Sequence, residues 1–227
     1  MLPDIEKFVN IHAHRLASFP DEWVLTNLLV QDYPPDGYEE AQYSVGLHPW
    51  HIEKADTDLL LKKVELATEN TKVLAIGETG LDKVIKTPLD QQIKVFEAQV
   101  NMAEQYDLAV IIHLVKAFNE LKEFIKVHHP SAPMVIHGFR GGRKLADELL
   151  NNGFYISLGA ALLNSEKLQE VAMSVPLTRL FLESDEDDIH IHDLYKKVAE
   201  LREIPIELLK IRVCENALRV FKEPIEY

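Results

Sequence analysis

Short apolar segments alternate with amphipathic segments along most of the chain, and this alternation predicts an α/β fold. The apolar segments have the length of strands, and they are apolar continuously rather than at every second position. Continuous apolar strands separated by helices are typical of a parallel sheet that is covered on its faces. Eight strands are predicted, over residues 8–12, 24–30, 42–47, 72–77, 108–113, 133–137, 154–158 and 179–183.

The amphipathic segments between the strands predict helices. One covers residues 57–70, where leucines recur at helical spacing. Another covers residues 89–105 and follows Thr87 and Pro88, a pair that favours a helix start because Thr caps the first turn and Pro fits its first position. Further helices are predicted over residues 118–127, 142–151, 190–202 and 205–219. This order of elements predicts a (β/α)8 TIM barrel, whose active site lies at the C-terminal ends of the strands.

The first part of the chain leaves little room for helices. Between His14 and Val24 there is space for a loop but hardly for a full crossover helix, and residues 33–37 have the proline and glycine content of a loop. We therefore expect a barrel with its early helices shortened or missing. The chain has no linker, repeat or low-complexity segment, so residues 1–227 are expected to form a single domain.

Most of the predicted strands end at, or just before, a residue that can bind a metal ion. Buried strands give no packing reason for imidazoles and carboxylates at the same end, whereas a metal site at the mouth of a barrel does. The residues in question are His12, His14, His48, Glu78, His113, His137 and Asp185.

The clearest local element is His12-Ala13-His14. In an extended strand, residues i and i+2 point to the same side, so both imidazoles can approach one ion. An isolated pair of this kind is equally compatible with two polar loop histidines. A lone histidine such as His113 or His137 is similarly compatible with a core residue that is hydrogen-bonded to a carbonyl. The candidates at the other strand ends favour the metal-binding interpretation.

Imidazole suits zinc, whereas carboxylate and water favour magnesium or manganese, so the mixed set leaves Mg, Mn and Zn open. A mononuclear catalytic zinc site uses three protein ligands. The larger set predicts two divalent metal ions, with a carboxylate such as Glu78 bridging them. Asp185 lies in an acidic run that by itself indicates a solvated surface. Its place after an apolar strand favours a ligand that also accepts a proton from the attacking water, and Glu183 is expected to orient a histidine ligand.

Charge and cysteine content restrict the function classes. The formal net charge of −13 argues against broad attraction to nucleic acid or to an anionic membrane. A bound divalent ion reverses the local sign of the charge, so polyanionic substrates are disfavoured but not excluded. The single cysteine, Cys214, fits a reducing compartment and a small buried side chain, and the start of the chain has no long apolar run, so a cytoplasmic location is expected. The aromatic residues fit core or rim packing, and Trp50 beside His48 also suits a wall of the site.

The chain resembles the TatD family of metal-dependent hydrolases, in the amidohydrolase-like barrel superfamily, from His12 to Phe221. The most specific matching segments are Gly46-Leu47-His48-Pro49 and Gly77-Glu78-Thr79-Gly80-Leu81-Asp82. The resemblance implies a TIM barrel with divalent-metal-dependent deoxyribonuclease activity. It also implies that His48 contacts substrate. The metal ligands that the resemblance implies are His12, His14, Glu78, His113, His137 and Asp185.

The sequence departs from the family pattern beside these ligands. Asn10 stands where the family usually has Asp, Val115 where it has Arg, and Arg140 where it has Ser, while Glu186 and Asp187 replace Ser-Pro. One interpretation is that Arg140 takes over the anion-binding role of the missing arginine, because a guanidinium suits bidentate phosphate recognition. A solvent-facing Arg140 beside a glycine turn is equally compatible with the sequence.

The expected activity is hydrolysis of an ester bond, with a phosphodiester favoured, by metal-activated water with Asp185 and Glu78 as catalytic residues. DNA or another phosphoester is the expected substrate, and neither a membrane nor an obligate protein partner is expected. One alternative is hydrolysis of a small phosphoester, lactone or amide. A second is a catalytically inactive metal-binding barrel, against which the complete ligand set argues. The oligomeric state is left open.

Overall fold

The structure is a computed structural model that describes residues 2–34, 41–54 and 56–222. Part of the loop predicted over residues 33–37 lies outside these ranges. The chain divides into two compact units. Unit 1 comprises residues 1–26 and 135–221, and unit 2 comprises residues 27–134 and 222–227. The expectation of one domain over residues 1–227 stays a prediction.

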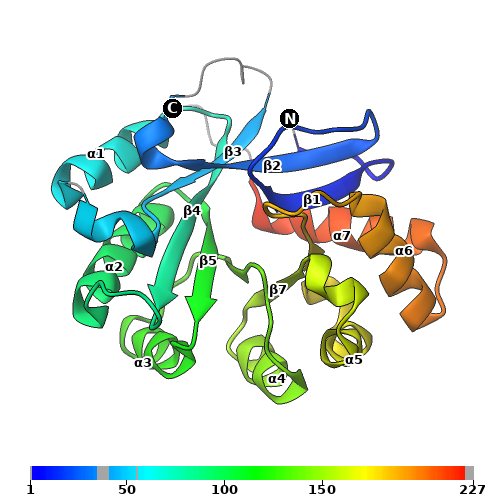
Figure 1. Ribbon diagram of the computed structural model, residues 1–227. Coiled ribbons are helices and arrows are strands. Elements are labelled where there is room, and N and C mark those ends of the chain that lie inside the picture. Colours follow the sequence, from blue (N-terminus) through cyan, green and yellow to red (C-terminus); the bar gives the residue numbers. More distant parts are fainter. Residues whose placement is uncertain (1, 35–40, 55, 223–227) are drawn as a thin grey trace. The chain divides into compact units, whose positions relative to one another are not determined.

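The eight predicted strands are all present, and they follow one another in chain order in one sheet. Every strand pair within a unit is parallel, as for β3 with β4 and for β7 with β8. The strands are β1 (Phe8–Ala13), β2 (Glu22–Leu29), β3 (Gln42–Gly46), β4 (Val73–Asp82), β5 (Ala109–Val115), β6 (Met134–Ile136), β7 (Tyr155–Leu158) and β8 (Leu180–Leu182) (Figure 1).

Seven α-helices occur among the described residues. They are α1 (Thr57–Ala67), α2 (Leu89–Gln105), α3 (Phe118–His128), α4 (Arg143–Asn151), α5 (Glu166–Ser174), α6 (Ile191–Arg202) and α7 (Ile206–Val220). The short 3-10 helices are η1 (Val30–Asp32), η2 (Pro49–Lys54), η3 (Ala160–Leu163) and η4 (Leu177–Arg179). In the described residues no helix joins β1 to β2, and only η1 follows β2 directly, so the prediction of shortened or missing early helices is confirmed. None of the described helices is long and apolar enough to cross a membrane.

In unit 2, helix α2 lies beside β4 (Figure 1). It holds strand backbones through two buried glutamines. The Gln92 side chain accepts from the Asp82 N–H over 2.7 Å and donates to the Asp82 carbonyl over 2.9 Å. The Gln99 side chain likewise accepts from the Leu47 N–H over 2.7 Å and donates to the Leu47 carbonyl over 3.1 Å, just beyond β3. Each amide therefore satisfies backbone groups that are buried away from water. The ends of β3 and β4 are fixed by this helix.

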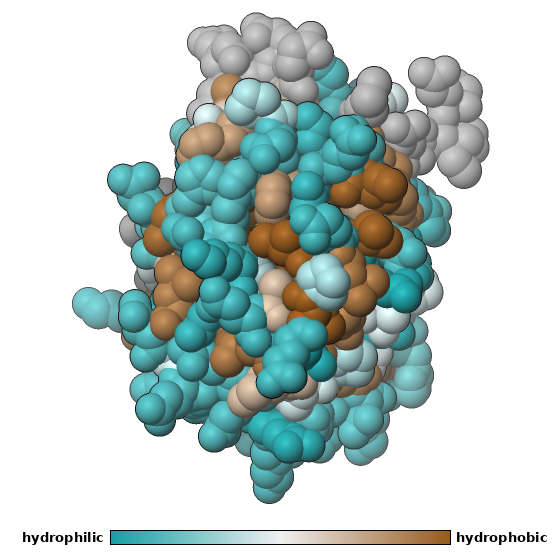
Figure 2. All heavy atoms as spheres, turned by 90° about the vertical axis from the view of Figure 1, so that its right-hand side faces the viewer, coloured by the Kyte–Doolittle hydropathy of each residue, from teal (hydrophilic) through white to brown (hydrophobic). Residues whose placement is uncertain are grey.

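In unit 1, helices α6 and α7 pack beside β1. The buried Tyr195 hydroxyl donates to the Val9 carbonyl over 2.9 Å and accepts from the Val9 N–H over 3.0 Å. Burial raises the Tyr195 pKa, which keeps the hydroxyl protonated. Cys214 on α7 is fully buried, and burial raises its thiol pKa, as a packing residue requires. The face that carries α6 is covered mainly by hydrophilic residues, with hydrophobic ones visible between them (Figure 2).

Candidate metal-binding groups

The first group lies in unit 1, where β1 ends and the segment after β8 begins. The backbones of Ala13 and Asp185 form a parallel bridge, and the Asp185 N–H donates to the His12 carbonyl over 2.9 Å. One carboxylate oxygen of Asp185, Oδ1, lies 3.5 Å from His12 Nε2 and 3.6 Å from His14 Nε2. His12 and His14, two residues apart, thus approach the same oxygen, as the strand geometry predicts.

The spacing in this group suits a shared cation. Two ligand atoms that bind one ion at about 2.1 Å in tetrahedral geometry lie about 3.4 Å apart. The distances of 3.5 and 3.6 Å from Asp185 to the two histidines are close to that value and longer than a good hydrogen bond. His12 is fully buried, whereas the side chain of Asp185 is 34% exposed. Asp185 and His14, whose side chain is 28% exposed, are therefore the members of the group that water or a substrate can reach.

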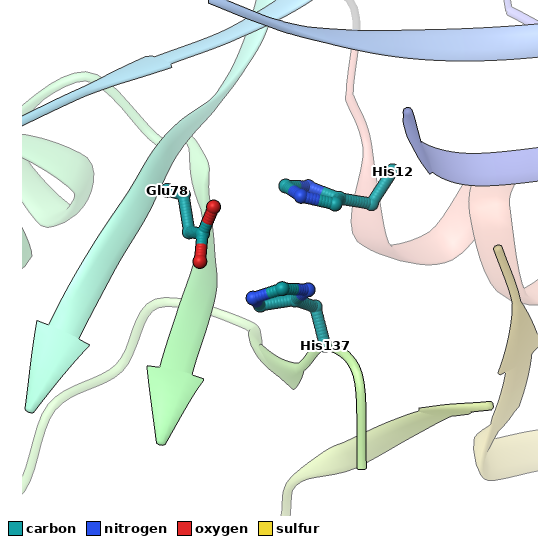
Figure 3. Close-up of side chains that lie close together, drawn as sticks. All are labelled: His12, Glu78 and His137. Atoms are coloured by element: carbon teal, nitrogen blue, oxygen red, sulfur yellow. The ribbon is translucent and has the colours of Figure 1, made fainter. Parts of the chain in front are cut away.

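His137 also belongs to unit 1 and follows β6. Its ring lies against the His12 ring, with centroids 4.2 Å apart and planes inclined by 36° (Figure 3). Its Nδ1 atom lies 3.3 Å from Oε1 of the fully buried Glu183, and the Gly138 N–H donates to the same oxygen over 2.6 Å. His137, Glu183 and Asp185 place ligand atoms within 4.8 Å of one another. The contact between His137 Nδ1 and Glu183 Oε1 is the one that the predicted orienting role of Glu183 requires.

The second group lies in unit 2 and is centred on Glu78 of β4, which Figure 3 shows as a side chain projecting from that strand. Oε1 of Glu78 lies 2.7 Å from His113 Nδ1 and 3.1 Å from His48 Nε2. All three residues place ligand atoms within 4.8 Å of one another. His48, predicted to contact substrate rather than metal, therefore shares a donor group with two predicted ligands.

Asp82 completes the second group, and the sequence predicted no role for it. Its Oδ2 atom lies 2.8 Å from Trp50 Nε1, which donates to it, and 3.2 Å from His113 Nε2. Burial opposes the ionisation of Asp82, but hydrogen bonds from Trp50, from the Val84 N–H and from His113 outweigh it and hold its pKa below the usual value. An ionised carboxylate only accepts hydrogen bonds, so the contact with Asp82 favours a proton on His113 Nε2.

The position of the proton on His113 bears on whether the second group suits a cation. With the proton on Nε2, a neutral His113 presents the lone pair of Nδ1 toward Glu78 Oε1 at 2.7 Å. In that tautomer no proton lies between the two atoms, an arrangement that a cation beside both lone pairs would stabilise. The donor chemistry of the group therefore fits a divalent cation, as the mixed imidazole and carboxylate ligands also do.

Asn10 contacts no histidine of the first group in the hydrogen bonds of the described residues. Its amide donates to Glu22 Oε1 over 2.9 Å and to Ser184 Oγ over 2.8 Å, and its oxygen accepts from the Ser184 N–H over 3.0 Å. Ser184 lies between Glu183 and Asp185 in the chain. Asn10 therefore supports the backbone that carries these two acidic residues.

Two further departures from the family pattern lie on segments that carry predicted ligands. Val115 ends β5, which carries His113, and its carbonyl accepts from the Lys83 N–H over 3.0 Å. Arg140 is exposed, three residues after His137, and its own carbonyl accepts from Lys167 Nζ over 2.7 Å. Within the part of the chain that the structure describes, no hydrogen bond or ion pair engages the Arg140 guanidinium, so this cation is available to an anion.

Comparison with known proteins gives a family match over most of the chain. The family described as TatD related DNase matches residues 32–222. An uncharacterized metal-dependent hydrolase of Haemophilus influenzae is 31% identical over 200 residues, which are 79% of this chain and 76% of that protein. A protein of Erwinia amylovora named 3'-5' ssDNA/RNA exonuclease TatD is 32% identical over 150 residues, which are 63% of this chain and 56% of that protein.

A solved structure shows the same fold. The crystal structure of YjjV, a TatD homologue from Escherichia coli, superimposes with a TM-score of 0.82 at 24% identity and covers 96% of this chain and 99% of that one. This likeness, together with the strand order, confirms the predicted (β/α)8 TIM barrel.

Proposed function

Because this chain belongs to the TatD family of metal-dependent hydrolases, we propose that it is a divalent-metal-dependent phosphodiesterase acting on DNA. The observation that carries the proposal is a repeated arrangement of one carboxylate oxygen facing two imidazole nitrogens. Asp185 faces His12 and His14 in unit 1, and Glu78 faces His48 and His113 in unit 2. The name of the Erwinia amylovora relative supports the choice of a nucleic acid as substrate.

The proposed ligands of two divalent ions, Mg, Mn or Zn, are those that the sequence predicts. They are His12, His14, Glu78, His113, His137 and Asp185. When bound, divalent ions of this kind lower the pKa of a coordinated water and neutralise charge on phosphoryl oxygens. Glu183 holds His137 in orientation, and Asp82 fixes the tautomer of His113, as carboxylates beside metal-binding histidines do.

In the proposed reaction, the oxygen of a water molecule attacks the phosphorus atom while the bond from phosphorus to the leaving oxygen breaks. Asp185 accepts the proton of the attacking water, a role that its partial exposure permits. A proton returns to the leaving oxygen, so the products are a hydroxyl group and a phosphomonoester. Glu78 acts as the second catalytic carboxylate by holding the ligand group of unit 2.

Two further residues are proposed to contact the substrate. His48 lies beside Glu78 in the second group. Arg140 presents an exposed guanidinium on the segment that carries His137, and bidentate hydrogen bonds from a guanidinium match two phosphate oxygens.

The test is metal content together with hydrolysis of a 5′-labelled single-stranded DNA in Mg²⁺, in Mn²⁺ and in chelator. We expect the purified protein to bind divalent ions and to shorten the DNA only when they are present. His12→Ala and His113→Ala should each lower the metal content and abolish hydrolysis, whereas His129→Ala, at an exposed position at the end of α3, should change neither. A wild-type protein that binds no divalent ion would refute the proposal.

A second candidate is hydrolysis of a small phosphoester, lactone or amide. The net charge of −13 and the valine at position 115 favour it, because both weaken attraction to a polyanion. Turnover of a small chromogenic ester without hydrolysis of DNA would select this function. Metal binding without hydrolysis of any ester would select the inactive barrel.

The proposal also includes a cytoplasmic location, which the single cysteine of the sequence supports. It includes no obligate protein partner.

A further inference from the structure

Trp50 is exposed at the edge of the second ligand group. Its side chain is 52% exposed, although tryptophan is among the residues that gain most from burial. It belongs to η2, directly after Pro49. Single exposed apolar residues are common on protein surfaces, so exposure alone indicates no function.

The orientation of this indole is fixed, which distinguishes it from an ordinary exposed side chain. Its Nε1 donates to Asp82 Oδ2 over 2.8 Å, and its backbone N–H donates to His48 Nδ1 over 3.1 Å. The ring meets the rings of His48 and His113 edge to face, with centroids 5.0 and 5.9 Å apart. The polar edge of Trp50 is therefore satisfied within unit 2, and it remains in place without a further loss of side-chain entropy when a ligand binds.

We propose that Trp50 is a stacking surface for a planar aromatic ring, namely the nucleobase attached to the phosphodiester that is presented to Glu78 and His113. The choice of a nucleobase rests on the proposed function. The place of Trp50 beside His48 and His113 puts the stacked ring next to the reacting group. Because every base has a π face, stacking tolerates any sequence.

The stacking role does not require a net positive charge, which this chain lacks. Proteins that bind nucleic acid without sequence preference usually obtain affinity from a basic surface, and the net charge of this chain is −13. A ring that stacks on an indole gains affinity without positive charge. Binding through Trp50 should therefore depend only weakly on salt concentration, whereas binding through several lysine or arginine contacts would depend on it steeply.

The two tryptophans of the chain allow a direct binding measurement. Trp23 is 9% exposed, so a ligand that stacks on Trp50 should change the emission of one tryptophan only. We expect thymidine 5′-monophosphate to quench this emission and deoxyribose 5-phosphate, which carries the same phosphate without a base, to leave it unchanged. In Trp50→Phe, where Trp23 is the remaining tryptophan, the quenching should disappear.

Kinetics on a short thymidine oligonucleotide supply the second measurement. Trp50→Leu keeps an apolar side chain but removes the π face, and we expect KM to rise roughly five- to 150-fold, the range of one base stacked on an aromatic ring. Trp50→Phe should recover part of the loss, and kcat should change less than KM. Leu66→Ala, which alters an exposed apolar residue of α1, should leave both constants unchanged. Thermal melting verifies that each variant is folded.

Equal quenching by the two phosphates, or an unchanged KM in Trp50→Leu, would overturn the stacking role. Failure of the proposed function has a different signature, because the wild-type protein would then bind no metal or hydrolyse no DNA. The quenching experiment requires no turnover, so it decides the role of Trp50 in that case also. If Trp50→Leu does not fold, the comparison of the wild-type protein with Trp50→Phe decides it from the quenching alone.

Discussion

The side-chain amide of Asn10 donates a hydrogen bond to Oε1 of Glu22 over 2.9 Å, and both residues are buried. An aspartate at position 10, the residue that the TatD pattern usually has, would place a second carboxylate at this distance from Glu22. Like charges at such a distance in a buried site cannot both ionise readily. The amide is therefore the chemical complement of Glu22, and its oxygen holds the Ser184 N–H at the same time.

Asn10→Asp should lower the free energy of unfolding by about 1–3 kcal/mol at pH 7, because it replaces a buried hydrogen-bond donor with an acceptor. Urea unfolding followed by circular dichroism measures the change. The double variant Asn10→Asp with Glu22→Gln should regain most of the loss, since an amide then faces the new carboxylate. Asn152→Asp, at an exposed position after α4, serves as the control and should have little effect. An Asn10→Asp variant as stable as the wild type would contradict the complementarity argued here.

The second prediction concerns pH and Glu22. Burial opposes the ionisation of Glu22, but hydrogen bonds from Arg15, from Asn10 and from the Ser18 N–H outweigh it, so its pKa lies below the usual value. A pKa that is lower in the folded state than in the unfolded state contributes stability above the unfolded value, about 4.3, and this contribution is lost as the pH falls through the folded value.

The melting temperature of the wild-type protein should therefore decrease on acidification from pH 5 to pH 3 more steeply than that of Glu22→Gln. The glutamine variant should be less stable at pH 7, because it leaves the Arg15 guanidinium without its carboxylate partner. Parallel pH profiles for the two proteins would exclude Glu22 as a source of acid sensitivity.

A third prediction concerns Asp82, which receives hydrogen bonds from Trp50 and His113 through one oxygen. Asp82→Asn removes the charge that fixes the His113 tautomer, and we expect metal affinity to fall about 10- to 100-fold. A competition titration with a chromogenic chelator measures it. The fold should persist, because Gln92 binds the backbone of residue 82 and not its side chain. Asp90→Asn, at an exposed position on α2, is the matched control, and equal metal affinity in both variants would remove Asp82 from the site.

The fourth prediction separates the two interpretations of Arg140. If its guanidinium binds the phosphate, Arg140→Ala should raise KM for a phosphodiester about tenfold or more, the loss expected for a charge-assisted hydrogen bond. Arg143→Ala, an exposed arginine on α4 that is paired with Asp147, is the control and should leave KM unchanged. If Arg140→Ala turns over a phosphodiester as the wild type does while His113→Ala is inactive, Arg140 is a solvent-facing residue only.

The strands could be predicted because continuous apolar segments are a direct consequence of burial in a parallel sheet. The end of β4 could not be predicted in the same way. Its apolar run stops at Gly77, but the strand continues to Asp82, and Thr79 to Asp82 pair with β5. Gly80 allows this pairing, because a Cβ atom there would lie 2.0 Å from the His113 carbonyl oxygen. Hydropathy therefore does not mark the end of a strand whose last residues are polar and face a site.

Helix α5 was not predicted, although its signals are present in the sequence. Ser165 caps its first turn by accepting from the Leu168 N–H over 3.4 Å, and Leu168, Val171 and Ala172 form its buried face at helical spacing. The role of Asp82 had no comparable signal. Its contact with Trp50 joins residues 32 positions apart in the chain. Ligand candidates follow from strand ends, whereas supporting residues depend on tertiary contacts.

The hydrogen bonds from Gln92 and Gln99 to strand backbones limit where residues can be inserted into or deleted from the chain. Seven residues of an α-helix make nearly two turns and rise about 10.5 Å, so both amides project from one face of α2 and reach Asp82 and Leu47 together. One inserted or deleted residue between them would rotate one amide by about 100° away from its strand. Natural insertions and deletions among relatives of this chain should therefore fall in the connecting loops and spare residues 92–99. In that segment the helical spacing of the two glutamines matches the spacing of the strand ends.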